Sequence, residues 1–167
     1  MKTLIVIDMQ NDFISGSLAN PDAQAIVDKI VKRIDEFDGM VLATRDTHNP
    51  DYLETPEGKQ LPIVHCVENT EGWEIEPSIA AALQRKKAIV LDKPTFGYLG
   101  WGILSFTEDV ELVGTCTDIC VVSNAILIKT MYPETTVRVR ADLCAGTSKE
   151  NHQASLNVMR ACQMEII

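Results

Sequence analysis

The strongest constraint on the fold is a series of short apolar runs, which are separated by amphipathic segments. The runs are rich in β-branched and aliphatic residues and are apolar at nearly every position. Such runs suit strands that are buried on both faces, as in a parallel sheet. We expect strands at 3–7, 40–43, 88–91, 109–113 and 135–139, with a further edge strand at 164–167.

Helices are expected between these strands. Asn20-Pro21 has the form of an N-cap followed by proline at the first helical position, and Ser148 is a second candidate cap. The expected helices are 20–39, 77–87, 120–131 and 148–162, whereas 51–61 is expected to be irregular, 62–67 extended and 97–102 a loop or short helix. Strands that alternate with helices predict an α/β fold with a mostly parallel sheet and right-handed crossovers.

The composition limits the domain count, the partners and the compartment. A chain of 167 residues is expected to form a single domain, 1–167. The net charge of −9 argues against nucleic acid or an anionic membrane as a partner. Five cysteines without a CxxC motif indicate a reducing, cytoplasmic setting. The first apolar run is too short for a signal peptide, and no run approaches the length of a membrane span.

Polar residues follow several of the expected strands. Asp8, Asp46 with His48, Lys93 and Cys120 each come after a different apolar run. In open α/β sheets, ligands bind beyond the carboxyl ends of the strands. The sequence therefore predicts a site where these side chains meet.

Cys120 is the candidate nucleophile because it lies at an expected strand-to-helix turn. The positive end of the helix dipole is expected to lower the pKa of its thiol, and nearby backbone N–H groups can form an oxyanion hole. Asp8 can act as the base, and the Lys93 ammonium can stabilise both carboxylate and thiolate. The alternatives are a packed cysteine, a turn aspartate and a solvated lysine.

Asp46, His48 and His65 form a candidate metal site. Two imidazoles and one carboxylate suit zinc or ferrous iron with coordination positions left open. The alternative is that His48 is an ordinary loop residue and His65 a satisfied core histidine. His152 is expected on the surface. Three cysteines are expected to be core thiols: Cys66, Cys144 and Cys162. Five aromatic residues could line a pocket or pack in the core: Phe13, Trp73, Phe96, Tyr98 and Trp101.

Five blocks of the sequence resemble the isochorismatase-like cysteine hydrolase superfamily, in the order the superfamily has them. The blocks are 6–13 (VIDMQNDF), 45–48 (RDTH), 65–67 (HCV), 93–97 (KPTFG) and 114–121 (GTCTDICV). The resemblance implies a Rossmann-like, three-layer α/β/α sandwich with a catalytic triad of Asp8, Lys93 and Cys120. It also implies a cis peptide bond at Thr115–Cys116 and an oxyanion hole made by the backbone N–H groups of Cys116 and Cys120.

The nicotinamidase-like branch of this superfamily adds a metal site. Carried over, its ligands are Asp46, His48 and His65, holding zinc, with iron or manganese as alternatives. The sequence departs from that branch at Pro62, which is displaced by one position, and at Asp51-Tyr52, where the branch has a Ser-Phe pair. Ile119 stands where an aromatic residue often lines the pocket. The expected substrate pocket is formed by Phe13, Trp73, Tyr98 and Ile119.

These observations predict a cysteine-dependent amidohydrolase that cleaves a small carboxamide through a thioester. The resemblance favours nicotinamide, hydrolysed to nicotinic acid and ammonia, and a homo-oligomeric assembly. The alternatives are a hydrolase of another small amide, a hydrolase of isochorismate and a non-catalytic binding module. Vinyl ether hydrolysis does not need a thiol nucleophile, so Cys120 disfavours isochorismate.

Overall fold

The centre of the molecule is a six-stranded sheet in the order β3-β2-β1-β4-β5-β6. The fold comes from a computed structural model, which describes residues 1–106 and 108–167. Every pairing between neighbouring strands is parallel, which confirms the expected α/β class. The strands are β1 (Thr3–Ile7), β2 (Met40–Asp46), β3 (Ile89–Lys93), β4 (Val110–Thr115), β5 (Val137–Ala145) and β6 (Glu165–Ile166).

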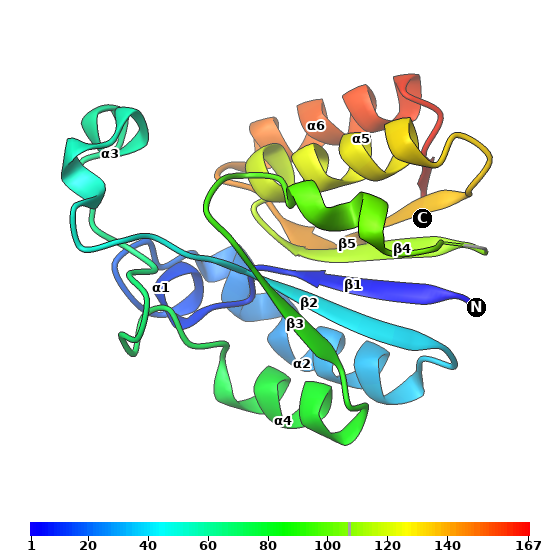
Figure 1. Cartoon of the computed structure of the whole chain (residues 1–167), viewed down its shortest axis with the longest axis horizontal. Coiled ribbons are helices and arrows are strands. Elements are labelled where there is room, and N and C mark those ends of the chain that lie inside the picture. The colour runs from blue at the N-terminus through cyan, green and yellow to red at the C-terminus, as the bar shows by residue number, and fades with distance from the viewer. Residues whose placement is uncertain (107) are drawn as a thin grey trace.

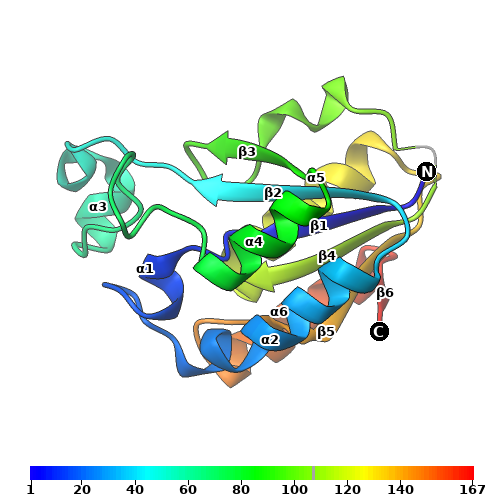
Figure 2. The same ribbon diagram turned by 90° about the horizontal axis from the view of Figure 1, so that it is seen from below.

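Helices cover both faces of the sheet, so the molecule has three layers (Figure 1). One face carries α2 (Pro21–Glu36) and α4 (Pro77–Arg85), and the other carries α5 (Val122–Met131) and α6 (Lys149–Ala161). Five shorter helical segments complete the described structure: α1 (Asn11–Ile14), η1 (Tyr52–Glu54), α3 (Pro56–Gln60), η2 (Leu99–Ile103) and η3 (Thr117–Val121). Figure 2 shows α1 and α3 beyond the carboxyl ends of the strands.

The sheet separates two apolar cores. Ile26, Ile30 and Ile34 of α2 pack in the first core, together with Leu4 and Val6 of β1. The intervening residues of the same strand face the second core, which the residues of α5 and α6 complete. Each residue of β1 is buried, because this strand lies in the middle of the sheet between two helical layers. This is the pattern that the continuous apolar run predicted.

The two expected helix caps are present. The Asn20 side chain accepts a hydrogen bond from the Asp22 amide at 2.9 Å, and Pro21 is the first residue of α2. The Ser148 side chain accepts from the Asn151 amide at 3.0 Å at the start of α6. Each bond satisfies one of the amide groups that the first turn of a helix leaves without a partner.

The segment 51–61 is helical, which corrects the prediction of an irregular loop. It contains η1 and α3, and the Thr55 side chain caps α3 by accepting from the Gly58 amide at 3.0 Å. Pro56 begins this helix, as proline favours. The polar composition of this segment gave no helical pattern, although the Thr55 cap and Pro56 favour a helix there.

The prediction that 88–91 is a buried strand was also wrong in part. The strand exists as β3, but it lies at the edge of the sheet, where Ile89 is 52% exposed and Val90 is 39% exposed. This edge strand pairs with β2 on one side only, and its first four residues are exposed or half-buried. An apolar run therefore does not distinguish a central strand from an exposed edge.

Two single residues differ from expectation. Cys162 is exposed at the end of α6 and is not a core thiol. His152 is half-buried, and its Nδ1 atom lies 2.8 Å from the Thr117 hydroxyl. Its helix packs against η3, which brings the imidazole to the turn that contains Cys120.

The strand register brings the polar strand ends together. Ile7 pairs with Thr44 on one side and with Gly114 on the other, while Asp46 pairs with Lys93. Gly114 has a φ of +122°, and a Cβ atom there would lie 2.1 Å from the Ile7 carbonyl oxygen. Glycine therefore allows β4 to approach β1 directly beside Asp8. Among the described residues, no helix is long and apolar enough to cross a membrane.

Candidate active site and metal centre

Three strand ends bring Asp8, Lys93 and Cys120 into contact. The Lys93 Nζ atom lies 2.7 Å from Asp8 Oδ2 and 3.5 Å from Cys120 Sγ. Lys93 and Asp8 are fully buried, and Cys120 is 4% exposed. The other Asp8 oxygen, Oδ1, accepts from the Thr44 hydroxyl at 2.7 Å. A thiol, an ammonium and a carboxylate thus share one buried site.

The protonation states of these groups follow from burial and charge. Burial raises the pKa of Asp8, although Lys93 acts in the opposite direction. Burial also raises the pKa of Cys120 well above its usual value, and the nearby Asp8 charge adds to this effect. Burial alone would lower the pKa of Lys93, but the negative groups around it outweigh that effect and raise the pKa.

The raised pKa of Cys120 corrects the expectation that the helix dipole favours a thiolate. Cys120 lies inside the π-helical turn η3, with its side chain against the Asp8 carboxylate and away from solvent. Desolvation and the Asp8 charge disfavour the thiolate more than the Lys93 charge favours it, so the pKa of Cys120 is raised. The raised pKa favours the neutral thiol form of Cys120.

A turn of unusual geometry carries the cysteine. The Thr115–Cys116 peptide bond is cis, as expected, and the Val121 amide donates to the Cys116 carbonyl at 3.0 Å. Single π-turns are frequent at functional sites. The turn places both Cys116 and Cys120 on the wall of one cavity.

Asn124 fixes this turn to the loop that follows β3. Its amide nitrogen donates to the Cys120 carbonyl at 2.8 Å, and its oxygen accepts from the Tyr98 amide and from the Trp101 indole N–H. Asn124 is fully buried. The sequence analysis missed this residue, although an asparagine within the apolar run of α5 is a signal that could have identified it.

The cavity in front of Cys120 has a volume of about 350 Å³. Two of the four expected pocket residues, Phe13 and Ile119, line it, together with Leu18, Leu61 and Phe96. The volume lies within the usual range for small-molecule sites, and the lining is mostly apolar. We call it the substrate cavity.

The other two expected pocket residues lie elsewhere. The Trp73 indole N–H donates to the Thr47 hydroxyl at 2.8 Å, and the Arg45 guanidinium lies 3.5 Å from the ring centroid. The Tyr98 ring packs edge to face on Trp101, with centroids 5.0 Å apart. Both aromatic residues stabilise the scaffold next to the site, so the expectation that they line the pocket is corrected.

Four side chains beside the triad form a cluster of possible metal ligands. Asp46, His48, Glu57 and His65 each offer one ligand atom, and these atoms all lie within 4.8 Å of one another. The Nε2 atoms of His48 and His65 lie 2.9 and 3.6 Å from Asp46 Oδ2. Sequence analysis predicted three of these residues and missed Glu57.

Glu57 was missed because it lies in the segment that was expected to be irregular. Its carboxylate approaches His48 Nε2 to 3.8 Å because α3 orients it toward the end of β2. Burial and the nearby Asp46 charge raise the pKa of Glu57. An acidic residue between the two histidines in sequence was the only available signal.

The donor set fits a divalent cation. Imidazole and carboxylate are the ligands that zinc, iron and manganese accept, and the His65 Nδ1 atom lies 2.8 Å from the Ile63 carbonyl oxygen. That contact orients the ring and leaves Nε2 for a metal, as is usual for metal-binding histidines. The cluster can thus hold a divalent metal ion.

The charges of the cluster favour ligation. Burial alone would raise the pKa of Asp46, but contacts with His48 and His65 outweigh this and lower it well below its usual range. Asp46 Oδ1 also lies 3.2 Å from Lys93 Nζ. Asp46 therefore links the metal cluster to the triad through one carboxylate.

Two side chains that the sequence analysis did not select hold the ligands in place. The Gln10 side chain accepts from the Asp46 amide at 2.7 Å and donates to the Asp46 carbonyl at 2.8 Å. The Asp12 carboxylate accepts from the Cys66 amide at 2.7 Å, directly after His65. Both lie in the first sequence block, immediately after β1.

Fold and site together define a class of hydrolase, and comparison with known proteins identifies it. The family model described as the Isochorismatase domain matches residues 2–167. The chain therefore belongs to the isochorismatase family.

Within this family, several similar proteins are named nicotinamidases. The nicotinamidase/pyrazinamidase of Mycobacterium tuberculosis is 30% identical over 187 residues, which cover 100% of this chain and 98% of the relative. The nicotinamidase of Saccharomyces cerevisiae is 28% identical, over 82% of this chain and 85% of its own. The crystal structure of the pyrazinamidase/nicotinamidase of Streptococcus mutans superposes with a TM-score of 0.84 at 29% identity, covering 100% of both chains.

Proposed function

We propose that this protein hydrolyses nicotinamide to nicotinic acid and ammonia. It is a hydrolase of carbon–nitrogen amide bonds, and the proposal assigns its reaction to Cys120 at the base of the substrate cavity. The observation that carries the assignment is the contact of Lys93 Nζ with both Asp8 Oδ2 and Cys120 Sγ, at 2.7 and 3.5 Å. The relatives named nicotinamidases supply the substrate class.

The first half of the reaction releases ammonia. The Cys120 sulfur attacks the carboxamide carbon while Asp8 accepts the thiol proton. The backbone N–H groups of Cys116 and Cys120 stabilise the oxyanion that forms. Asp8 then returns the proton to the amide nitrogen, the carbon–nitrogen bond breaks, and a thioester remains on Cys120.

The second half uses water. Asp8 accepts a proton from the water that attacks the thioester carbon and gives it to the Cys120 sulfur as the carbon–sulfur bond breaks, which releases the acid and regenerates the thiol. Lys93 keeps its charge throughout and stabilises whichever of Asp8 and Cys120 is negative. The raised pKa values of Asp8 and Cys120 suit this exchange, because each group can hold the proton in turn.

Asp46, His48, Glu57 and His65 would hold a divalent metal, and we propose zinc, with iron or manganese as alternatives. Such an ion supplies a fixed positive centre that orients a substrate carrying a ring nitrogen. His65 and Asp46 also line the substrate cavity, so the cluster and Cys120 face the same space. That shared wall supports a substrate with a carboxamide on a nitrogen-containing ring.

The test is ammonia release from nicotinamide by the purified, zinc-loaded protein. We expect turnover that stoichiometric alkylation of Cys120 abolishes and that metal removal lowers. Pyruvate release from isochorismate is the matched assay for the alternative hydrolase. Turnover of isochorismate without turnover of nicotinamide would contradict the proposal, and so would the absence of both activities in the loaded protein.

Assembly is part of the same proposal, and we expect a homo-oligomer. Apolar side chains are exposed on the edge strand β3 and on η2: Ile89 52%, Val90 39%, Leu99 73% and Ile103 87%. An edge strand also offers backbone groups that a second copy can pair with. Light scattering should give a mass above that of one chain, and Val90→Lys should shift it toward the monomer. A monomeric wild-type protein at micromolar concentration would contradict this expectation.

A further inference from the structure

A second cavity reaches the metal-ligand cluster without touching Cys120. Its volume is about 420 Å³, compared with about 350 Å³ for the substrate cavity. We call it the outer cavity. Residues that line it include His48, Thr55, Glu57, Gln60, Thr95 and Phe96.

The two cavities divide the four ligands between them. Asp46 and His65 line the substrate cavity, His48 lines the outer cavity, and Glu57 lines both. Phe96 also borders both, so Glu57 and Phe96 form part of the wall that separates them. An ion held by the cluster would thus be approachable from two directions.

Chemistry distinguishes the two directions. The substrate cavity is mostly apolar and is filled when an amide lies over Cys120, which closes that approach. The outer cavity is lined by the polar residues His48, Gln60 and Thr95, and Glu57 borders it as well as the substrate cavity. Oxygen donors around an acidic group suit a hydrated cation better than an apolar wall does.

Glu57 is the ligand best placed to move. Its side chain is 25% exposed, whereas those of Asp46 and His48 are 6% and 7% exposed. It lies on α3, a helix of five residues, while Asp46 is the last residue of β2 and is held by Gln10. Figure 1 shows α3 standing apart from the main body of the sheet and helices.

We propose that the outer cavity is the route by which the metal ion enters and leaves, with Glu57 the first ligand to receive it. The inference rests on the proposed function, because it takes the metal cluster as given. It predicts that metal exchange and occupation of the substrate cavity are independent of each other.

The test narrows the outer cavity at Gln60, an exposed residue on its lining. Gln60→Trp adds a bulky side chain there without altering a ligand. The matched control is Leu53→Trp, because Leu53 is 46% exposed on the neighbouring η1 and lines neither cavity. The metal is removed by a chelator, and Co²⁺ is added in a stopped-flow absorbance experiment. Release is followed by mixing the loaded protein with excess chelator.

We expect Gln60→Trp to slow both association and release of Co²⁺ by about tenfold, with an unchanged dissociation constant. Leu53→Trp should behave as the wild type. In a second arm, Cys120 is alkylated with a benzyl-bearing thiol reagent that fills the substrate cavity, and both rates should stay at their wild-type values.

Three results would overturn the proposal. The first is that Gln60→Trp binds and releases Co²⁺ at wild-type rates. The second is that Gln60→Trp slows association alone and weakens Co²⁺ affinity by the same factor, since this would place the effect at the ligands. The third is slow exchange after alkylation of Cys120. A protein that binds no Co²⁺ refutes the metal site and the route together. Absence of nicotinamide turnover in a protein with the expected exchange rates refutes the proposed substrate and supports the route.

Discussion

The triad and the metal cluster lie side by side and are linked by the contact of Asp46 with Lys93, yet the fold builds them differently. Asp8 follows the last residue of β1, Lys93 ends β3, and Cys120 lies in the turn after β4, so each is placed at or just beyond the end of a paired strand. The cluster takes Asp46 from β2, but it takes Glu57 from the short helix α3 and His65 from a segment without regular secondary structure.

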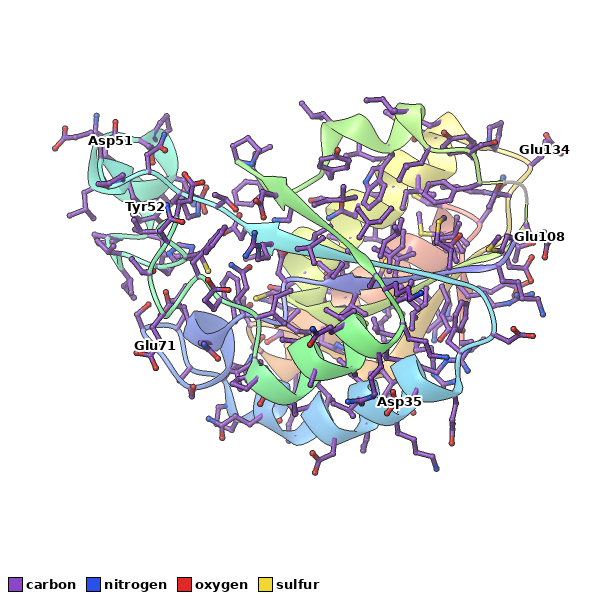
Figure 3. The ribbon with its side chains drawn as sticks, turned by 60° about the horizontal axis from the view of Figure 1, so that its bottom comes forward. Asp35, Asp51, Tyr52, Glu71, Glu108 and Glu134 are labelled. Atoms are coloured by element: carbon purple, nitrogen blue, oxygen red, sulfur yellow. The ribbon has the colours of Figure 1, made fainter. Side chains whose placement is uncertain are left out.

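The two regions differ in the interactions that hold their side chains in position. Parallel strands place Asp8 and Lys93 through many backbone bonds, and Asn124 holds the turn that carries Cys120. The cluster instead depends on individual contacts such as Asp12 with the Cys66 amide and Tyr52 with the Leu61 carbonyl. Figure 3 shows Tyr52 on the inner side of this segment and Asp51 at its outer tip. We therefore expect substitutions in the triad to lower activity directly. Substitutions around the cluster should instead weaken metal binding by disturbing the contacts that hold the ligands.

The largest effect should come from Cys120→Ala. Removing the proposed nucleophile should lower kcat by about 10⁴-fold or more, because Cys120 is the thiol that contacts Lys93. Ammonia release measures the loss. Metal content should remain at the wild-type level, since Cys120 belongs to the other region. A variant that loses its metal as well would show that the two regions are not separable.

Asp8→Asn should lower kcat by about 10²–10⁴-fold, because the amide cannot accept the thiol proton. The raised pKa of Asp8 also sets a pH dependence. Asp8 must be deprotonated to act, so kcat/KM should fall as the pH drops through a value above the ordinary carboxyl pKa of about 3.9. The measurement is a pH profile at constant metal content. If the residual activity of Asp8→Asn falls at low pH in the same way as that of the wild type, a group other than Asp8 causes this fall.

Asn124→Ala should destabilise the turn that carries Cys120. It leaves the half-buried Tyr98 amide and the buried Trp101 indole N–H without their acceptor. Each such loss costs about 1–3 kcal/mol of unfolding free energy. Chemical denaturation measures it, and Asn124→Asp, which keeps the acceptor oxygen, is the control. If the alanine variant is as stable as the wild type, the hydrogen bonds of Asn124 do not stabilise the fold.

Asp12→Asn tests the support of the cluster. The change weakens the acceptor for the Cys66 amide, so His65 should be held less firmly. We expect about a tenfold loss of metal affinity, at the low end of what supporting contacts contribute. Calorimetric titration of the metal-free protein with zinc measures it. At saturating zinc, kcat should return toward the wild-type value, which a defect in the triad would not allow.

Tyr52→Phe should have the smallest effect. It removes the hydroxyl that donates to the Leu61 carbonyl at 2.9 Å but keeps the ring, whose centroid lies 4.7 Å from that of His48 and 4.9 Å from that of His65. The expected loss is about 1 kcal/mol of local stability. Hydrogen exchange of the α3 amides should increase while that of the strands does not. Equal changes in both would contradict the contrast between the two regions.

Much of the fold could be predicted because the spacing of apolar residues and the capping of helices are local properties of the sequence. The apolar runs indicated five strands and an edge strand, and Asn20-Pro21 and Ser148 marked two helix starts that the structure contains. The same reasoning did not find α3, since the Thr55 cap and Pro56 determine a helix whose composition is polar. It also could not locate β3 at the edge, because the order of strands in a sheet is not a local property.

The sequence by itself determined which polar residues follow which strands, and so which side chains can meet at the carboxyl edge of the sheet. Tertiary structure decided how they act on one another. Only packing buries Cys120 beside Asp8 and raises its pKa, where a turn viewed in isolation predicts the opposite. Only packing brings Glu57 to His48 and takes Trp73 away from the cavity. Burial and electrostatic interaction depend on distances between residues remote in sequence, and these distances exist only in the folded chain.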